Sequence, residues 1–303
     1  MPPQTPPPET LFLVGPTASG KTAATLNLAD VLHGEIVNAD AFQLYAGLDI
    51  ITAKPTPEQR SRHPHHLFGT LSSADSCDAQ RYHQLALPRL HEIVSRGRTP
   101  IVVGGSGLYL KALTHGLDPL PAGDPELRRQ FAAQSLEEKV RQLLALDPAA
   151  SENVPLQNPR YVERALEICL LTGQPQSALR LSATRPPPRI RGFCLTWSRA
   201  TLYQRINERV HHMIAQGAIE EVAAAEPLSG ALLKAIGVRE IQAHLRGELT
   251  LAETIDAIQQ ATRRYAKRQM TWFRREACFQ TICLDDHPTP DSLASFILAS
   301  LHA

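Results

Sequence analysis

The chain has 303 residues, of which 43% are hydrophobic and 20% are charged. A chain of this size and composition can bury one sizeable core and a smaller second one. Its 31 Lys and Arg residues almost balance its 30 Asp and Glu residues, which gives a formal net charge of +1. The overall charge therefore does not favour a nucleic-acid partner, and a polyanion would need a local basic surface.

The cysteines and the apolar runs restrict the compartment. Five cysteines are present, an odd number, and no CxxC pair occurs; this favours neither a disulfide framework nor a zinc site. Residues 1–10 are rich in Pro and contain no Lys or Arg, so we expect a disordered lead-in rather than a signal peptide. No apolar run approaches the ~18 residues that span a bilayer. We expect a soluble, cytoplasmic monomer with no membrane partner.

Short apolar strands alternate with helices over residues 11–119. In chain order, the pattern predicts a strand at Leu11–Val14, a helix at Thr22–Leu32, a strand at Glu35–Asn38, a helix at Leu85–Ser95 and a strand at Pro100–Val103. This alternation is typical of a parallel sheet with crossover helices. We therefore predict an α/β fold.

The sequence changes character after Pro119. Helices are predicted at Pro125–Leu146 and Asn158–Leu171, with Gly173 as a stop, so we interpret residues 120–187 as a helical insertion domain. Residues 188–303 would return to the core. They are predicted to hold a strand at Ile190–Trp197, an amphipathic helix around 202–213, a second at 251–275 and a last strand at Phe279–Leu284.

The segment after the first strand has the pattern G-x-x-x-x-G-K-[ST]. Its residues are Gly15, Pro16, Thr17, Ala18, Ser19, Gly20, Lys21 and Thr22. A strand precedes it and a helix follows, which is the context of a phosphate-binding P-loop. The glycines let backbone N–H groups and the helix N-terminus approach phosphate oxygens. Lys21 would add a charge, and the Thr22 hydroxyl can ligate Mg²⁺.

The position of carboxylates does not settle the reaction. Most P-loops bind ATP or GTP for hydrolysis or phosphoryl transfer, and such enzymes carry a metal-binding Asp at the end of another strand. The third strand here ends in Gly104-Gly105-Ser106, whereas Asp40 follows the second strand. Asp40 is either a metal-site carboxylate or a different group at the mouth of the same site.

Ordered sequence blocks over residues 11–275 resemble the tRNA dimethylallyltransferase family. The blocks are GPTASGKT at 15–22, NADAFQLYAGLDIITAKP at 38–55, PHHL at 64–67, VVGGSGLYLKAL at 102–113, RALE at 164–167, RINERV at 205–210, AIGVRE at 235–240 and TRRYAKRQMTWFR at 262–274. The resemblance implies a P-loop NTPase-like core with a helical insertion that clasps tRNA. It also implies transfer of a dimethylallyl group from dimethylallyl diphosphate to the exocyclic amine of the adenosine 3′-adjacent to the anticodon, with release of diphosphate.

The same resemblance implies roles for individual residues. The P-loop, residues 15–22, would hold the diphosphate leaving group, with Lys21, Thr22 and a Mg²⁺ ion on Thr22 stabilising its charge. Asp40 would act as general base. The residues implied in contact with tRNA are Asp40, Ala41, Phe42, Gln43, Ser106, Arg128, Arg160, Arg164, Arg239, Lys267, Arg268 and Arg274.

The helix at 251–275 supports an RNA partner independently of the blocks. It carries six Lys and Arg residues and no acid between Arg263 and Arg275, and these fall on adjacent stripes opposite an apolar side. Such a band is either a phosphate-binding surface or a solvated helix face. A target base would have to leave its stack to reach the site.

Several positions depart from the family pattern. Ala41 stands in place of Ser, Ile51 in place of Gly and Ser106 in place of Thr, while Tyr161 stands where the family has an Arg that Arg160 would replace. The histidines of the 63–66 segment lack surrounding metal ligands and are interpreted as loop residues. Three alternatives stay open: an adenylate isopentenyltransferase that uses free AMP, ADP or ATP, a P-loop NTPase or kinase, and a non-catalytic RNA-binding protein.

Overall fold

The structure is a computed structural model that describes residues 5–118, 120–179, 189–225, 227–228, 230–287 and 289–302. The chain divides into two compact units, Met1–Thr114 with Pro187–Ala303, and His115–Pro186. Within the predicted lead-in, residues 1–4 lie outside the described residues, and a turn closes where the Thr10 N–H donates to the Pro7 carbonyl at 3.0 Å.

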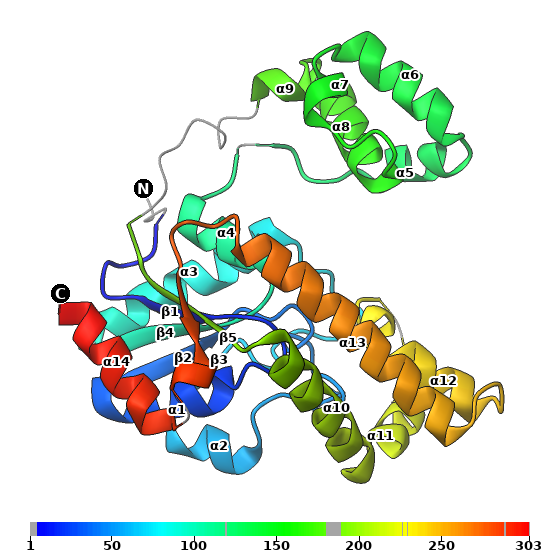
Figure 1. The fold of residues 1–303 in the computed structure, drawn as a ribbon. Coiled ribbons are helices and arrows are strands. Elements are labelled where there is room, and N and C mark those ends of the chain that lie inside the picture. Colours follow the sequence, from blue (N-terminus) through cyan, green and yellow to red (C-terminus); the bar gives the residue numbers. More distant parts are fainter. Residues whose placement is uncertain are drawn as a thin grey trace. The chain divides into compact units, whose positions relative to one another are not determined.

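The first unit is built on one six-stranded sheet in which all neighbouring strands pair in parallel (Figure 1). Its order is β3-β2-β4-β1-β5-β6. The strands are β1 (Leu11–Val14), β2 (Gly34–Asn38), β3 (His65–His66), β4 (Thr99–Gly104), β5 (Arg191–Thr196) and β6 (Gln280–Cys283). The predicted α/β fold and its parallel sheet are confirmed. Because parallel strands end at a common edge, the loops after β1, β2, β4 and β5 meet there.

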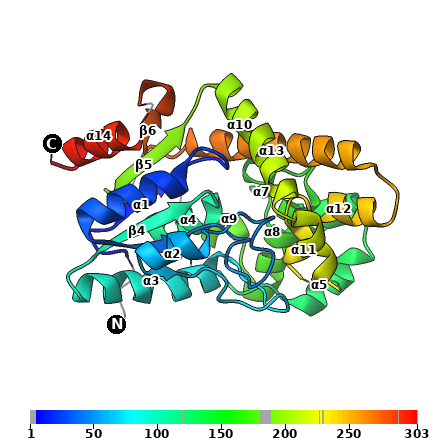
Figure 2. The same cartoon turned by 90° about the horizontal axis from the view of Figure 1, so that it is seen from below.

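Helices cover both faces of this sheet. Helices α1 (Lys21–Leu32) and α14 (Pro290–His302) pack together on one face, and α3 (Ala79–Ser95) covers the other (Figure 2). The face under α1 and α14 forms a core of alternate strand residues, among them Leu11, Leu13 and Ile101. This alternation follows from the two-residue period of a strand.

Further helices complete this unit. They are α2 (Pro57–Arg62), α4 (Gly107–His115), α10 (Arg199–Ala215), α11 (Ala218–Ala224), α12 (Val238–Leu245) and α13 (Leu251–Phe273), with short 3₁₀ turns η2 (Leu232–Lys234) and η3 (Leu284–Asp286). The helices α10 and α13 pack side by side (Figure 1). Both were predicted, whereas α2, α4, α11, α12 and α14 were not.

The second unit is a small helical body. Its helices are α5 (Pro125–Ala132), α6 (Leu136–Leu146), α7 (Ala150–Asn153), α8 (Pro159–Thr172) and α9 (Gln176–Leu179). The prediction of one continuous helix over Pro125–Leu146 is wrong. Ser135 starts a new helix there through a capping box. The Ser135 hydroxyl accepts from the Glu138 N–H, and the Glu138 carboxylate accepts from the Ser135 N–H.

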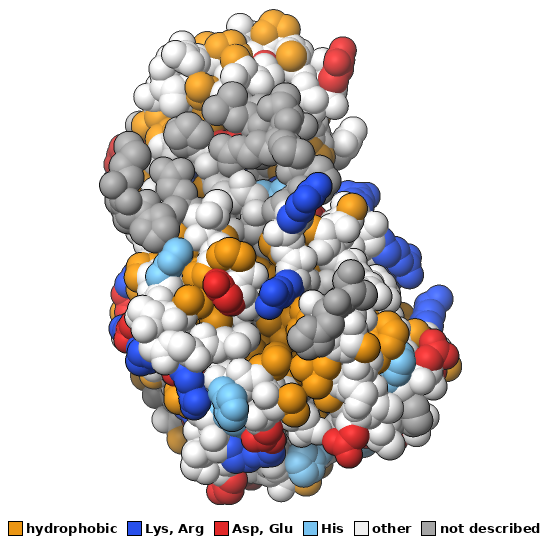
Figure 3. Space-filling model, turned by 90° about the vertical axis from the view of Figure 1, so that its left-hand side faces the viewer, with side chains coloured by type: hydrophobic (Ala, Val, Ile, Leu, Met, Phe, Trp, Pro, Cys, Tyr) orange, Lys and Arg blue, Asp and Glu red, His pale blue; other side chains and the backbone are white. Residues whose placement is uncertain are grey.

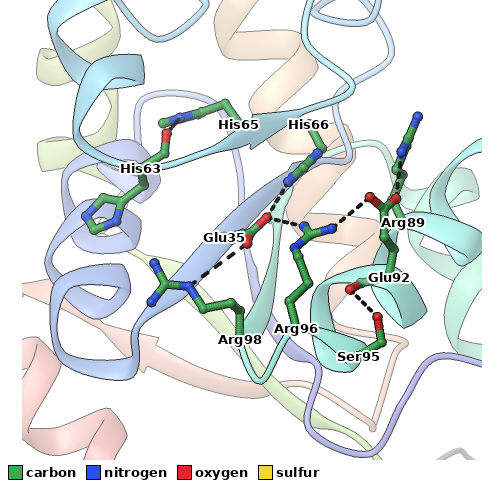
Figure 4. A network of polar contacts seen from close by, with 9 residues as sticks. All are labelled: Glu35, His63, His65, His66, Arg89, Glu92, Ser95, Arg96 and Arg98. Atoms are coloured by element: carbon green, nitrogen blue, oxygen red, sulfur yellow. Dashed lines mark hydrogen bonds and ion pairs between the residues drawn. The ribbon is translucent and has the colours of Figure 1, made fainter.

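The interpretation of the PHHL histidines as loop residues is also wrong. His65 and His66 form the edge strand β3, paired with β2. His66 lies 2.7 Å from the buried carboxylate of Glu35 on β2, which also accepts from Arg96 at 2.8 Å (Figure 4). These contacts fix a strand too short to be recognised by its hydrophobic pattern.

One face of the molecule is mixed in charge. On the face drawn in Figure 3, acidic and basic side chains are interspersed with apolar and uncharged ones. This agrees with the net charge of +1. Among the described residues, no helix combines the length and apolar character needed to cross a membrane.

Candidate active site

The loop between β1 and α1 has the backbone geometry of an anion-binding turn. Gly15 adopts φ +147°, and a Cβ there would lie 2.3 Å from the Leu195 carbonyl oxygen, so only glycine fits. Ala18 and Gly20 also have positive φ angles, of 62° and 91°. Gly20 is the N-cap of α1 and makes no side-chain cap. The first N–H groups of the helix therefore remain available to an anion.

Lys21 lies on this loop as the sequence predicts. Its amino group donates to the carbonyls of Gly15 at 2.9 Å and Pro16 at 2.6 Å, with a longer contact of 3.4 Å to the Ser19 hydroxyl. Burial lowers the pKa of Lys21 to about 8, although the nearby Asp40 carboxylate opposes this change. A buried cation with a lowered pKa favours binding of an anion, which would restore the charged form.

Asp40 follows β2 at the same edge of the sheet. The Asn38 side chain fixes the turn, because it accepts from the Asp40 N–H at 2.8 Å and donates to the Leu67 carbonyl at 2.9 Å. One carboxylate oxygen of Asp40 accepts from the Phe42 N–H at 3.1 Å. Burial raises the pKa of Asp40, while the Phe42 N–H and Lys21 act to lower it. A carboxylate with a raised pKa is a better proton acceptor.

Two arginines on α10 were missed as site residues. Arg205 and Arg209 lie one helical turn apart and both line the cavity defined below. Arg205 donates to the Ala18 carbonyl at 3.0 Å and stacks over Trp197, 4.9 Å from the ring centroid. Burial lowers the pKa of Arg209, and Asp40 opposes this effect. The RINERV block contained both residues, but only the fold shows that they face the P-loop.

Gln269 on α13 joins two loops of the site. Its amide oxygen accepts from the Thr17 N–H at 2.9 Å, and its amide nitrogen donates to the Gly105 carbonyl at 2.9 Å. The Gln269 side chain thus joins the P-loop to the loop after β4. It comes from a helix more than 150 residues later in the sequence. Sequence spacing alone offered no sign of this bridge.

These groups surround a cavity of about 500 Å³, here called the P-loop cavity. Of the predicted site residues, Thr17, Ala18, Ser19, Gly20, Lys21, Thr22, Asp40 and Gln43 line it. Gly15 and Pro16 shape the loop behind. Ala41 and Ser106 lie close to Asp40, since the Ala41 N–H donates to the Ser106 hydroxyl at 2.9 Å. Phe42 lies between Asp40 and Gln43 in the same turn and is partly buried.

Four further predicted tRNA residues of the first unit are basic and exposed. They are Arg239 on α12, Lys267 and Arg268 on α13, and Arg274, which is the C-cap of α13. Arg263, from the same basic band, instead donates to the Asn207 side chain at 2.6 Å. The band is therefore divided between one residue that holds α13 to α10 and others that face solvent.

The predicted tRNA residues of the second unit have mixed roles. Arg160 is exposed at the start of α8. Arg128 and Arg164 both pair with the buried carboxylate of Glu167, Arg128 at 3.1 Å and Arg164 at 2.5 Å. Burial acts to raise the pKa of Glu167, but the two arginines and the Asp124 N–H bring it below its ordinary value. These two arginines thus stabilise the unit itself, and Arg128 keeps 60% of its side chain exposed.

The oxygen groups of the cavity fit a divalent cation of the Mg²⁺ type. Thr22 is exposed in the first turn of α1, and its hydroxyl makes no hydrogen bond to the described residues. The Asp40 carboxylate lines the same cavity. Hydroxyl and carboxylate oxygens are hard ligands, which Mg²⁺ prefers together with water and phosphate oxygens.

The fold and this site define a P-loop α/β protein with a cationic cavity beside a buried carboxylate. A sequence model of the IPP transferase family matches residues 43–276, and the chain belongs to that family. The predicted resemblance is thereby confirmed. The chain is 43% identical to a tRNA dimethylallyltransferase of Geobacter metallireducens over 96% of this chain and 97% of the relative, and 40% identical to one of Akkermansia muciniphila over 96% and 99%.

A solved structure shows the same architecture. The tRNA isopentenylpyrophosphate transferase of Bacillus halodurans superposes with a TM-score of 0.71 at 34% identity, covering 98% of this chain and 97% of that one. The structure of a eukaryotic dimethylallyltransferase that acts on tRNA has a TM-score of 0.81 at 23% identity, and the match covers 95% of this chain and 77% of that one. The second likeness concerns the fold.

Proposed function

We propose that this chain transfers a dimethylallyl group from dimethylallyl diphosphate to the exocyclic amine of the adenosine 3′-adjacent to the anticodon in tRNA. The observation that carries the proposal is the content of one cavity. A P-loop with Lys21, two further arginines and a buried carboxylate all face the same space. Family membership and the names of the relatives support the prenyl donor and the tRNA acceptor.

The cationic side of the cavity suits a diphosphate leaving group. The bond from the first allylic carbon to the diphosphate oxygen breaks, and the leaving oxygen keeps the electron pair. Lys21, Arg205 and Arg209 lie where they can bind the resulting charge, together with the N–H groups at the start of α1. Preorganised cations in a partly dry site stabilise developing charge without reorganisation.

Asp40 suits the role of general base toward the acceptor. An adenine amine is a weak nucleophile because its lone pair is delocalised, so its N–H proton must leave as the C–N bond forms. Asp40 has one oxygen bonded to the Phe42 N–H at 3.1 Å, which leaves the other oxygen for the amine. Its raised pKa increases its affinity for that proton.

A magnesium ion fits this scheme as a partner of the diphosphate. Thr22 would hold it through the side-chain hydroxyl, which lines the cavity. When bound, the ion supplies charge neutralisation to the leaving diphosphate. A Thr22→Val variant would then show a weaker Mg²⁺ dependence of diphosphate binding, while its apo stability stays unchanged.

The tRNA would contact both units. We assign this role to Asp40, Ala41, Phe42, Gln43 and Ser106 near the cavity, to Arg239, Lys267, Arg268 and Arg274 elsewhere on the first unit, and to Arg128, Arg160 and Arg164 on the second unit. The exposed arginines and Lys267 suit phosphate contacts, which position RNA without reading its sequence. The cavity residues suit a base that has left its stack.

The direct test offers labelled dimethylallyl diphosphate and Mg²⁺ with unmodified tRNA or with AMP in parallel reactions. Label in tRNA alone supports the proposal. Label in AMP alone would place the chain among adenylate isopentenyltransferases. Label in neither acceptor, with ATP hydrolysed in a separate reaction, would refute prenyl transfer and favour a P-loop NTPase.

A further inference from the structure

The segment 47–54 lies beside the P-loop cavity and is held by an acidic residue from a helix much later in the chain. Glu221 on α11 accepts from the Ile50 N–H at 2.8 Å and from the Ile51 N–H at 2.9 Å, one with each carboxylate oxygen. Lys54, whose side chain is fully buried, closes the segment by donating to the Gly47 carbonyl at 2.6 Å and to Asp49 at 2.5 Å. The segment is therefore fixed from within and from α11.

The same segment determines how Gln43 is oriented. The Gln43 amide nitrogen donates to the carbonyls of Thr52 and Ala53, both at 3.0 Å. The reverse orientation would place an oxygen against two carbonyl oxygens, so the amide can only lie this way. Both N–H groups are thereby used. Its oxygen accepts no hydrogen bond from the described residues, and the Gln43 side chain lines the P-loop cavity.

This orientation has a chemical consequence for the acceptor base. Gln43 offers the cavity a hydrogen-bond acceptor and no donor. An exocyclic amine has two N–H groups, one for Asp40 and one for the Gln43 oxygen. Guanine has a carbonyl at that position. Its oxygen would lie against the Asp40 carboxylate and the Gln43 oxygen, which are also hydrogen-bond acceptors, and these buried groups would stay unpaired.

We propose that Glu221 is a positioning residue for the acceptor base. It fixes the backbone of residues 50–53, and the carbonyls of Thr52 and Ala53 in turn hold the Gln43 amide with its oxygen toward the cavity. This inference rests on the proposed function, since it concerns the same acceptor. Glu221 acts on the base through the 50–53 backbone and Gln43, without touching the base itself. Its contacts join α11 to the loop across 170 and 171 residues of sequence.

The test compares Glu221→Gln with Glu220→Gln. Both residues lie in the first turn of α11, and Glu220 is exposed, so the loss of charge near the helix N-terminus is matched. A glutamine at 221 can accept one N–H, but its own NH₂ would face the other. We expect kcat/KM for tRNA to fall about tenfold in Glu221→Gln and less than twofold in Glu220→Gln. The KM for dimethylallyl diphosphate should stay within about twofold.

A double-mutant cycle with Gln43→Ala separates positioning from general destabilisation. If Glu221 acts through Gln43, Glu221→Gln should cost less than about twofold more in the Gln43→Ala background. Amide exchange at Ile50 and Ile51 should also accelerate in Glu221→Gln at unchanged global stability. Should that variant not fold, Glu221→Asp keeps the charge and loses the reach to both N–H groups.

Two results would overturn the inference: an equal loss in both backgrounds, or equal activity of the 220 and 221 variants. A wild-type protein that transfers no label to tRNA would instead refute the proposed function. The two failures are therefore distinguishable, because the second appears before any variant is compared.

Discussion

Replacing Asp40 with Asn tests the chemistry of the site with little change in shape. The amide oxygen can still accept from the Phe42 N–H, which lies 3.1 Å from the carboxylate in the wild type. The variant loses the basic oxygen that would take the amine proton, together with the negative charge that acts on Lys21 and Arg209. General-base catalysis is worth about 10²–10⁴-fold, or about 3–5 kcal/mol of activation free energy. We expect a loss of that size in the single-turnover rate of dimethylallyl transfer.

The assay mixes excess enzyme with unmodified tRNA and labelled dimethylallyl diphosphate, and tRNA affinity is measured separately. Affinity should change less than about threefold, because one buried hydrogen bond is retained. Burial raises the pKa of Asp40, so the wild-type rate should fall as pH drops through that raised value, where the base becomes protonated. The residual rate of Asp40→Asn should lack this acid limb. A variant rate within tenfold of wild type would refute the general-base role.

Three further perturbations follow from the same contacts. Because burial lowers the pKa of Lys21 to about 8, calorimetry should show dimethylallyl diphosphate binding weakening above that pH, while Lys21→Arg stays charged and its binding stays flat. Gln269→Ala removes two hydrogen bonds of 2.9 Å between the P-loop and the β4 loop, so pyrophosphate should bind about tenfold more weakly; unchanged binding would contradict the bridge. Burial acts to raise the pKa of Glu35, but His66 and Arg96 bring it below its ordinary value. The Glu35 carboxylate therefore stabilises the folded protein at neutral pH, and this contribution is lost as the pH falls through the pKa of Glu35 in the folded state. Glu35→Gln should therefore lower the melting temperature at pH 7, with a difference that shrinks toward acid pH.

The sequence predicted those parts of the fold that depend on local pattern. The strands Leu11–Val14 and Pro100–Val103 were recognised because each is a continuous apolar run next to a turn, and the structure buries the first fully and most of the second. The helix over 251–275 was recognised from its periodic apolar side and ends at Phe273. By contrast, β3 contains two histidines whose place in the sheet depends on Glu35, a partner about 30 residues away.

The site shows the same division between local and distant information. The P-loop and Asp40 follow strands directly, so their meeting at one edge follows from the parallel sheet. Arg209, Gln269 and Glu221 reach the site from helices late in the chain. Their roles depend on which helix face turns inward, and this is fixed by packing between elements rather than by spacing within one.

The end of β4 explains why the carboxylate of this P-loop site lies after β2. A Cβ on Gly104 would lie 2.3 Å from the Ala39 backbone, and one on Gly105 would lie 2.2 Å from the Gln269 amide nitrogen. Neither position can carry the Asp that a P-loop ATPase places after such a strand. The space that this Asp would need is occupied by the turn that presents Asp40 and by the Gln269 bridge.

This packing favours prenyl transfer over nucleotide hydrolysis on geometric grounds. In Gly104→Asp, the new Cβ would lie closer to the Ala39 backbone than real Cβ contacts allow. The backbone itself would have to move, because the nearest atoms do not belong to a flexible side chain. We expect the variant to lose thermal stability and transfer activity without gaining ATPase activity. If Gly104→Asp folded normally and hydrolysed ATP, the close approach of β4 to the Asp40 turn could not be the reason that the site lacks that carboxylate.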